Sequence, residues 1–320
     1  MNRIIAATVA ATIGFAAPAA AQMQLAISAG GTGGVYYPVA GGIAEVITRH
    51  VEGHSAVAVV TGATVENMNQ IFTGDSDFAL GIADVLTQAI NGTDAFDGRP
   101  IPVRAVTSIY AAPMQVVVLA DGPIQSVQDV VGARFSVGAP GSGNEVNTRS
   151  VLAALGISFD DLGSTERLNY NETADGMRDG HVDGGLWAST APASSIMSLG
   201  AARNIRLVSL SEDEIEAIME HDPSFVPFTI PAGLYPGVDE PVQTVALANA
   251  MITHADMDEE LVYQVTRAIH ENHEFLVEVH PAMASMTPDF AVNTLPIPLH
   301  PGALRFYEEI GVEIPDHLRP

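Results

Sequence analysis

The feature that most constrains the fold is a repeated alternation of short apolar segments with segments of helical periodicity. The first half of the chain predicts strands at residues 24–28, 56–60 and 78–82, with helices at 36–50 and 65–72 between them. Short apolar runs indicate buried strands, whereas apolar residues three and four positions apart indicate amphipathic helices. Strands that alternate with helices form parallel sheets that helices cover on both faces.

A second series of the same kind occupies the middle of the chain. It predicts strands at 134–137, 182–187 and 205–209 and helices at 145–155 and 172–179. Two series indicate two α/β lobes. Because ligands of open α/β sheets bind beyond the carboxyl ends of the strands, two lobes that face each other make a ligand-binding cleft.

The segments outside these series predict the remaining elements. They indicate two separate strands at 103–108 and 115–119, a strand at 242–248, and one long amphipathic helix at 258–279.

The composition excludes several classes of partner and chemistry. The 320-residue chain has 38 acidic and 13 basic residues, a net charge of −25, and neither lysine nor cysteine. Without a basic stripe, we expect no binding to nucleic acid or to an anionic membrane surface. The lack of lysine excludes P-loop and Schiff-base sites, and the lack of cysteine excludes thiol catalysis, disulfides and cysteine-bound zinc.

The N-terminus predicts a secretory signal peptide over residues 1–21. Arg3 precedes an apolar, alanine-rich run, and Ala19-Ala20-Ala21 forms a small-residue cleavage site. The run is too short to span a bilayer, which requires about 20 residues. We therefore expect a mature chain that begins at Gln22, inserts into no membrane, and functions in the periplasm as a monomer.

A glycine-rich turn, Ser28-Ala-Gly-Gly-Thr-Gly-Gly-Val-Tyr-Tyr-Pro38, connects the first predicted strand to its helix. Glycines let the backbone approach a ligand, and a helix N-terminus presents free N–H groups and a positive dipole end. The turn is therefore a candidate cradle for a carboxylate or another anion. A dinucleotide fingerprint would need a third glycine where the chain has Tyr36. A tight turn without a ligand is the alternative.

A second turn, Gly138-Ala-Pro-Gly-Ser-Gly-Asn-Glu145, has the matching place in the second series. Ser142 and Glu145 fit a helix capping box, which is sufficient to explain both residues. The turn has no Lys-Ser/Thr pair for a phosphate-binding loop, and Pro140 and Asn144 stand where a nucleophile elbow requires glycine. Ser142 is thus a candidate hydrogen-bond donor and a poor nucleophile. One such turn in each half favours a shared ligand site.

Two further features allow two interpretations each. Thr61, Thr64 and Asn67 follow the second predicted strand, where they either cap a helix or reach a ligand. Trp187, the single tryptophan, ends a predicted strand in the second series and is either a core residue or a ligand platform.

The histidines and carboxylates predict neither a metal site nor a catalytic centre. His270 and His273 lie one helical turn apart, but Glu274 stands where a zinc-binding His-Glu-x-x-His motif requires histidine. We expect both histidines on a solvated helix face. No carboxylate pair stands out as an acid–base dyad. We therefore expect no metal, no cofactor and no catalytic residue.

The mature chain resembles the TAXI family of solute-binding proteins, the periplasmic substrate-binding subunits of TRAP transporters. The resemblance runs from about residue 24 to the C-terminus. The motifs that carry it are Ala29-Gly-Gly-Thr-Gly-Gly-Val-Tyr-Tyr-Pro38, Thr61-Gly-Ala-Thr-Val-Glu-Asn67, Val137-Gly-Ala-Pro-Gly-Ser-Gly-Asn-Glu145, Asp179-Gly-His-Val-Asp-Gly184 and Pro298-Leu-His-Pro-Gly-Ala303.

The resemblance implies an α/β, two-lobed fold of the periplasmic-binding-protein kind (type II), with crossing hinge strands. We expect lobe I to comprise residues 22–117 and 246–320, and lobe II residues 118–245. A small organic acid would bind between the lobes and pass to a TRAP permease. The expected ligand-binding residues are Thr32, Gly33, Gly34, Tyr36, Ala63, Asn67, Gly141, Ser142, Gly143, Asn144 and Trp187.

Three positions depart from the pattern of glutamate-binding and dicarboxylate-binding relatives. Ile82 stands where relatives often have glutamine, Asn144 where they often have threonine, and Trp187 where a smaller residue is common. These departures indicate a less polar or differently shaped ligand end.

Two other functions remain as alternatives to transport. The same receptor would serve a sensor system, and sequence alone does not separate that function from transport. An enzyme on the same scaffold would need a nucleophile–base pair or a metal, and the sequence offers neither.

Overall fold

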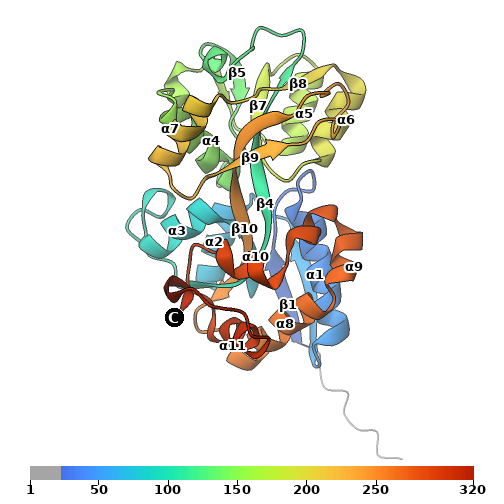
Figure 1. The fold of residues 1–320 in the computed structure, drawn as a ribbon, viewed down its shortest axis with the longest axis vertical. Helices are drawn as coiled ribbons and strands as arrows, with labels where there is room; N and C mark the ends of the chain where they lie inside the picture. The colour runs from blue at the N-terminus through green and yellow to red at the C-terminus, as the bar shows by residue number, and fades with distance from the viewer. Residues whose placement is uncertain (1–22) are drawn as a thin grey trace, which may run out of the picture.

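The computed structural model describes residues 23–320, and the predicted signal peptide lies outside this range. The described chain forms two lobes joined by two long strands, β4 (Val103–Leu119) and β10 (Val242–His254) (Figure 1). These strands pair antiparallel and run from one lobe into the other. The predicted lobe boundaries, 117/118 and 245/246, fall within them.

Lobe I, in the lower half of Figure 1, contains three parallel strands and the helices that cover them. Its elements are β1 (Met23–Ser28), β2 (His54–Val59), β3 (Phe78–Ile82), α1 (Tyr36–His50), α2 (Thr64–Thr73), α3 (Ala83–Asn91), α8 (Glu259–Glu271), α9 (His273–Val279), α10 (Pro288–Asn293) and α11 (Pro301–Glu309).

Lobe II, in the upper half of Figure 1, is built around three further parallel strands, β5, β6 and β7. Its elements are β5 (Arg134–Ser136), β6 (Ser164–Glu166), β7 (Gly184–Ala188), β8 (Ile205–Leu207), β9 (Val226–Ile230), α4 (Gly143–Ala154), α5 (Tyr170–Arg178), α6 (Ser194–Ala202) and α7 (Glu212–His221). Short 3₁₀ helices cover residues 94–96, 127–130, 159–161, 281–285 and 316–318.

All the strands belong to one continuous mixed sheet. Their order is β2-β1-β3-β10-β4-β7-β5-β6, with β8 on β4 and β9 on β10. Within each lobe the parallel strands point the same way, so their carboxyl ends meet at one edge of the sheet. These two edges face each other across β4 and β10.

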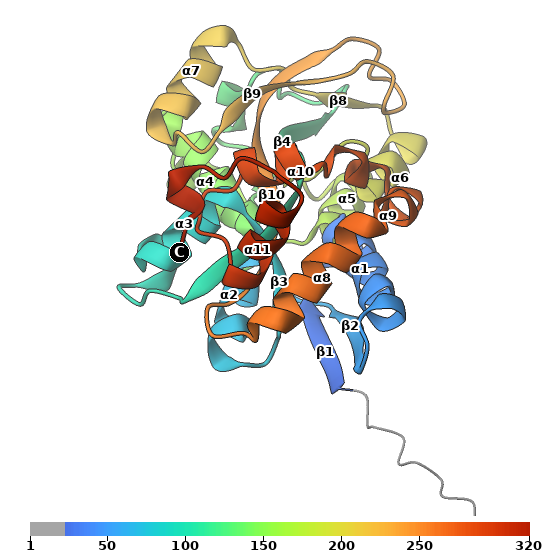
Figure 2. The same cartoon turned by 60° about the horizontal axis from the view of Figure 1, so that its bottom comes forward.

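Lobe I is closed by both ends of the chain. The apolar stripe of α1, with Val39, Ile43 and Ile47 fully buried, has the spacing of an amphipathic helix. Burial of each such side chain contributes about 1.5–3 kcal/mol. The C-terminal helices α8 and α9 pack against α1, and α11 packs against α8 (Figure 2).

Two expectations about the elements are wrong. The segments 103–108 and 115–119 form one strand, because the residues between them pair with β10 through positions such as Ala112 opposite Leu247. The helix expected at 258–279 breaks at Asn272, which ends α8 and begins α9. Within the described residues, no helix is long and apolar enough to cross a membrane.

Candidate ligand-binding site

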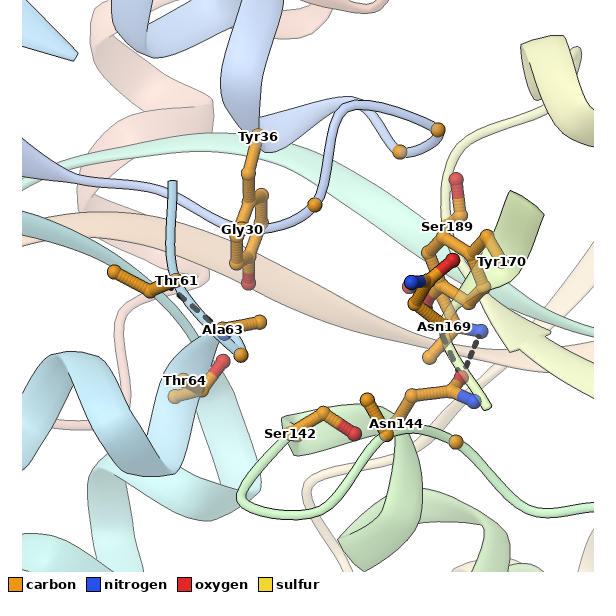
Figure 3. A pocket seen from close by; sticks show the side chains of 18 of the residues that line it. Gly30, Tyr36, Thr61, Ala63, Thr64, Ser142, Asn144, Asn169, Tyr170 and Ser189 are labelled. Carbon is orange, nitrogen blue, oxygen red and sulfur yellow. Dashed lines mark hydrogen bonds between the residues drawn. The ribbon is translucent and has the colours of Figure 1, made fainter. Parts of the chain in front are cut away.

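A cavity of about 230 Å³ lies between the two lobes. Its walls are the segments at the carboxyl ends of β1, β2 and β3 in lobe I and of β5, β6 and β7 in lobe II. Tyr110, in the middle of β4, adds a wall from the crossing strands. Figure 3 shows Tyr36, Thr61, Ala63 and Thr64 on one side of the cavity, opposite Asn144, Tyr170 and Ser189.

The lobe I wall is held by a buried asparagine behind it. Thr61, in the wall, donates its hydroxyl to Oδ1 of Asn67 over 2.6 Å. Nδ2 of Asn67 donates to the carbonyls of Ala29 and Leu80, both over 2.7 Å. The Ala29 carbonyl directly follows β1 and the Leu80 carbonyl lies in the middle of β3, so Asn67 fixes these two strands relative to α2. Its side chain is fully buried and does not line the cavity.

The backbone of the lobe I wall is strained at Ala63. This residue precedes α2 with φ +81° and ψ −149°, a conformation that favours glycine. Its N–H donates to the hydroxyl of Thr61 over 3.0 Å, which holds the turn in this shape. Strained residues of this kind persist where the surrounding structure fixes them, and they cluster at ligand sites.

Ser142 caps the helix that follows the second glycine-rich turn. Its Oγ accepts a hydrogen bond from the N–H of Glu145 over 3.1 Å, as the capping motif predicts. The reciprocal half of the box is missing, because the Glu145 carboxylate instead accepts from Nε of Arg167 over 2.9 Å. The Ser142 hydroxyl is buried at the cavity wall.

Asn144 organises the lobe II wall. Its Nδ2 donates to the carbonyl of Leu186 over 2.8 Å, and its Oδ1 accepts from the N–H of Ala188 over 2.7 Å. The hydroxyl of Tyr170 lies 3.3 Å from the same Oδ1 and donates to the carbonyl of Ala188 over 2.9 Å. The end of β7 and the start of α5 are thereby fixed to α4.

Three tyrosine rings line the cavity: Tyr36, Tyr110 and Tyr170. Burial raises the pKa of all three, and the neighbouring Tyr36 raises the pKa of Tyr110 and Tyr170 further. All three are therefore neutral hydrogen-bonding groups at physiological pH. Tyr36 donates to Oδ1 of Asn249 on β10 over 2.5 Å, which links the start of α1 to a crossing strand.

The two lobes contact each other around the cavity. The N–H of Glu66 donates to the carbonyl of Gly141 over 3.2 Å, and Ser194 donates its hydroxyl to the carbonyl of Gly33 over 3.3 Å. A Cβ on Gly33 would lie 2.2 Å from Oδ1 of Asn171 in the opposite lobe. A side chain at position 33 would therefore displace Asn171, and these contacts between the lobes are those of a closed form.

A buried acid–amide pair also bridges the lobes, from α3 to α4. Nδ2 of Asn147 donates to Oδ2 of Asp84 over 2.6 Å, while Oδ1 of each residue is buried without a partner among the described residues. Burial raises the pKa of Asp84 to about 8, with a further contribution from Asp222. Asp84 is therefore mostly protonated at neutral pH, which avoids an uncompensated buried charge.

The structure brings most of the predicted site residues to the cavity. Those that line it are Gly33, Gly34, Tyr36, Ala63, Ser142, Gly143 and Asn144. Four others do not: Thr32 is exposed, Gly141 contributes its carbonyl to the lobe contact, and Asn67 and Trp187 are fully buried behind the walls.

Trp187 packs behind Tyr170 and has no surface on the cavity. The two rings are stacked with their centroids 6.0 Å apart, and the indole N–H donates to Oγ of Ser195 over 3.1 Å. The core interpretation of this tryptophan therefore applies, although its ring sets the position of a tyrosine that lines the cavity.

Several residues that line the cavity were not predicted from the sequence, notably Tyr110, Asn169, Tyr170 and Ser189. Tyr170 begins α5 shortly after the end of β6, a position that signals a site at the sheet edge. Tyr110 falls in the gap left between two strands that are in fact one, so no pattern marked it.

The histidines of the α8–α9 region are not on a solvated face, contrary to expectation. Nε2 of His270 lies 2.9 Å from the hydroxyl of Tyr307, and its ring stacks on Phe306 at 5.3 Å. Burial, with a smaller effect of His273, lowers the pKa of His270 to about 4. No group of three or more potential metal ligands occurs in residues 23–320.

The fold and the cavity between the lobes define this chain as a protein with the two-lobed architecture of periplasmic solute-binding proteins. Comparison with protein families then gives its membership: the NMT1-like family model matches residues 27–311, and the chain belongs to that family.

Solved structures of the same architecture share little sequence with the chain. A protein of Bordetella bronchiseptica RB50 has a TM-score of 0.55 and 16% identity over 81% of this chain and 75% of its own. PhnD1 of Prochlorococcus marinus, in complex with methylphosphonate, has a TM-score of 0.53 and 10% identity over 82% and 91%. A third structure is described for glutathione import through GshT and the cystine ABC importer TcyBC of Streptococcus mutans. It has a TM-score of 0.51 and 11% identity, over 83% of this chain and 96% of its own. At these identities the similarity establishes the fold.

Proposed function

We propose that this protein is an exported receptor that captures a small organic acid between its lobes and delivers it to a membrane permease. The observation that carries the proposal is the cavity itself, which is walled by the strand ends of both lobes and by the crossing strands. Residues 1–21 would direct export to the periplasm and be removed there.

Hinge motion would open and close the site. We assign residues 22–117 and 246–320 to one rigid lobe and residues 118–245 to the other, with the hinge in β4 and β10. The ligand contacts both lobes only in the closed form and therefore shifts the population towards closure. The backbone contacts at Gly33 and Gly141 would break on opening.

The anionic character of the ligand is supported by the helices around the cavity. The N-termini of α1, α2 and α4 border it through Tyr36, Thr64 and Gly143. The first N–H groups of a helix have no partner within the helix and carry partial positive charge. Such termini bind carboxylates and other anions without a cationic side chain.

The proposed permease is of the TRAP type, on the strength of the glycine-rich motifs that resemble the TAXI family. An ABC importer is the second candidate, because the Streptococcus mutans structure of the same fold is described with one. Uptake into vesicles that contain the permease encoded beside this receptor discriminates between them. Uptake driven by an ion gradient without ATP supports the TRAP partner, and dependence on ATP supports the ABC partner.

The receptor function is tested by ligand-induced stabilisation and compaction. We would screen monocarboxylates, dicarboxylates, amino acids and organic sulfonates by thermal unfolding and by small-angle X-ray scattering. A ligand at about 100 times its Kd stabilises the native state by about 2.7 kcal/mol. We expect at least one acid to raise Tm and to reduce the radius of gyration without being converted. A panel that produces neither effect contradicts the proposal.

A substitution that obstructs closure provides the matched variant. A Cβ on Gly143 would lie 2.8 Å from Oγ1 of Thr64 and 2.9 Å from Ile82, both in the opposite lobe. We expect Gly143→Ala to fold normally, to bind at least about tenfold more weakly, and to lose the compaction. Gly41→Ala is the control, because no atom lies within 4 Å of its added Cβ. Equal compaction in both variants contradicts closure at this contact.

A further inference from the structure

The cavity contains no formal charge. Among the described residues that line it, none is Asp, Glu, Arg, Lys or His. Of the acids close to its walls, Glu66 accepts from the N–H of Gly62 and Glu145 accepts from Arg167. The buried Asp84 accepts from Asn147, and its raised pKa of about 8 keeps it mostly neutral at pH 7. A ligand in this cavity therefore meets neither a cation to pair with a carboxylate nor a carboxylate to pair with an amine.

One of the three phenols that line the cavity has no acceptor within the described part of the protein. Tyr110 is 2% exposed, and its hydroxyl has no hydrogen-bond partner among residues 23–320. The other two phenols differ, because Tyr36 donates to Asn249 and Tyr170 donates to the carbonyl of Ala188. The Tyr110 hydroxyl is not one of the fully buried unpartnered atoms, so it has access to the cavity and is available to donate to a ligand.

Beside the neutral polar side chains of Thr61, Thr64, Ser142, Asn144, Asn169 and Ser189, much of the lining is apolar or aromatic. Side chains of this kind from both lobes surround the donors, and they are Val35, Val60, Ala63, Ile82, Ala139, Leu168 and Ala188 together with the three tyrosine rings. Apolar walls favour an uncharged ligand body, and a few placed donors fix its orientation.

We infer that the ligand is an organic acid with a single carboxylate and an uncharged apolar or aromatic body, and that Tyr110 donates a hydrogen bond to the carboxylate. The inference rests on the proposed receptor function and narrows its ligand class. Helix N-termini and neutral hydroxyls would hold the one negative charge, while the tyrosine rings and aliphatic side chains contact the body.

A second charge on the ligand would be left without a partner. An amino acid would bury its ammonium group beside tyrosines and aliphatic side chains, and a dicarboxylate would bury a second anion there. An uncompensated buried charge opposes binding strongly. The cavity therefore discriminates against glutamate-like ligands, because no charged side chain lines it to pair with their second charge.

Isothermal titration with a matched set of probes tests the inference. The probes are phenylacetate and hexanoate as monocarboxylates, succinate and glutamate as doubly functional acids, benzenesulfonate as an alternative anion, and phenylacetamide as the neutral counterpart of phenylacetate. We expect a monocarboxylate to bind at least about a hundredfold more tightly than succinate, glutamate or the amide.

Tighter binding of succinate or glutamate overturns the single-charge inference but leaves the receptor proposal intact. Tighter binding of the sulfonate or the amide overturns the assignment of a carboxylate. If no organic acid binds, in this set or in the wider panel, the receptor proposal itself fails.

The role of Tyr110 is tested separately. Tyr110→Phe removes a hydroxyl that has no protein partner, so stability should be unchanged. Loss of a hydrogen bond to a charged group should weaken binding of the preferred monocarboxylate about tenfold to a hundredfold. The control Tyr263→Phe removes a hydroxyl that donates to Glu309 on an exposed surface of lobe I. Equal affinity in both variants overturns the role of Tyr110.

Discussion

In each lobe one asparagine holds neighbouring strands together, but only one of the two asparagines lines the cavity. In lobe I, Asn67 bonds the carbonyl that follows β1 and one in the middle of β3, and is separated from the cavity by Thr61. In lobe II, Asn144 bonds the end of β7 and also lines the cavity. The same side-chain chemistry therefore serves the framework alone in lobe I and both framework and site in lobe II.

The largest expected effect is that of Asn67→Ala on stability. The substitution leaves the carbonyls of Ala29 and Leu80 and the hydroxyl of Thr61 without their partner in a fully buried place. We expect the free energy of unfolding to fall by about 3–4 kcal/mol, as measured by urea denaturation. A loss below about 1 kcal/mol would show that Asn67 is not a framework residue.

Asn144→Ala should divide its effect between stability and binding. It removes the partner of Leu186 and Ala188 and releases Tyr170 from Oδ1, but its site is bordered by a cavity that water can enter. We expect a loss of about 2 kcal/mol in the free energy of unfolding and about tenfold weaker binding of the preferred acid. Calorimetry on both asparagine variants completes the comparison. The assignment of Asn144 to the site and of Asn67 to the framework alone is contradicted if Asn67→Ala weakens binding more than Asn144→Ala does.

A pH effect follows from the pair that joins the lobes. Because the pKa of Asp84 is about 8 in the folded state and about 4 in an unfolded chain, the native state binds the additional proton between these values. The free energy of unfolding should therefore fall as pH rises through this range, by up to about 1.4 kcal/mol per pH unit. Asp84→Asn keeps a neutral partner for Asn147 and should flatten that slope.

Denaturation curves of the parent and of Asp84→Asn at several pH values measure this effect. Asp222→Asn is the informative companion, because Asp222 helps to raise the pKa of Asp84. Removing its charge should shift the upper end of the window to lower pH. Parallel pH profiles for the parent and Asp84→Asn would mean that Asp84 does not titrate in this range.

The periodicity of apolar residues predicts most of the helices and strands. For α1 and β3 the predicted first and last residues are those of the structure. Periodicity fails where distant partners decide the outcome. Residues 109–114 carry no strand signal of their own, with Pro113 among them, and become part of β4 because β10 and β7 pair with them.

The glycine turns predict the location of the site, since they stand where strands end and helices begin. They do not predict the side chains that face the cavity. Tyr110 and Tyr170 resemble core tyrosines in the sequence, and only the approach of the opposite lobe leaves a space beside them. Conversely, Asn67 lies in a motif that suggests ligand binding, yet its amide donates to the backbone carbonyls of Ala29 and Leu80.

The closure of lobe I by both ends of the chain has a consequence for how the protein folds. Residues 78–82 in β3 pair with residues 249–253 in β10, and α1 packs against helices that follow β10. Lobe I cannot be completed until nearly the whole chain has been synthesised, whereas lobe II is almost continuous. Such non-local pairing slows folding. Under the proposed export, the N-terminal strands would leave the ribosome long before the partners that complete lobe I.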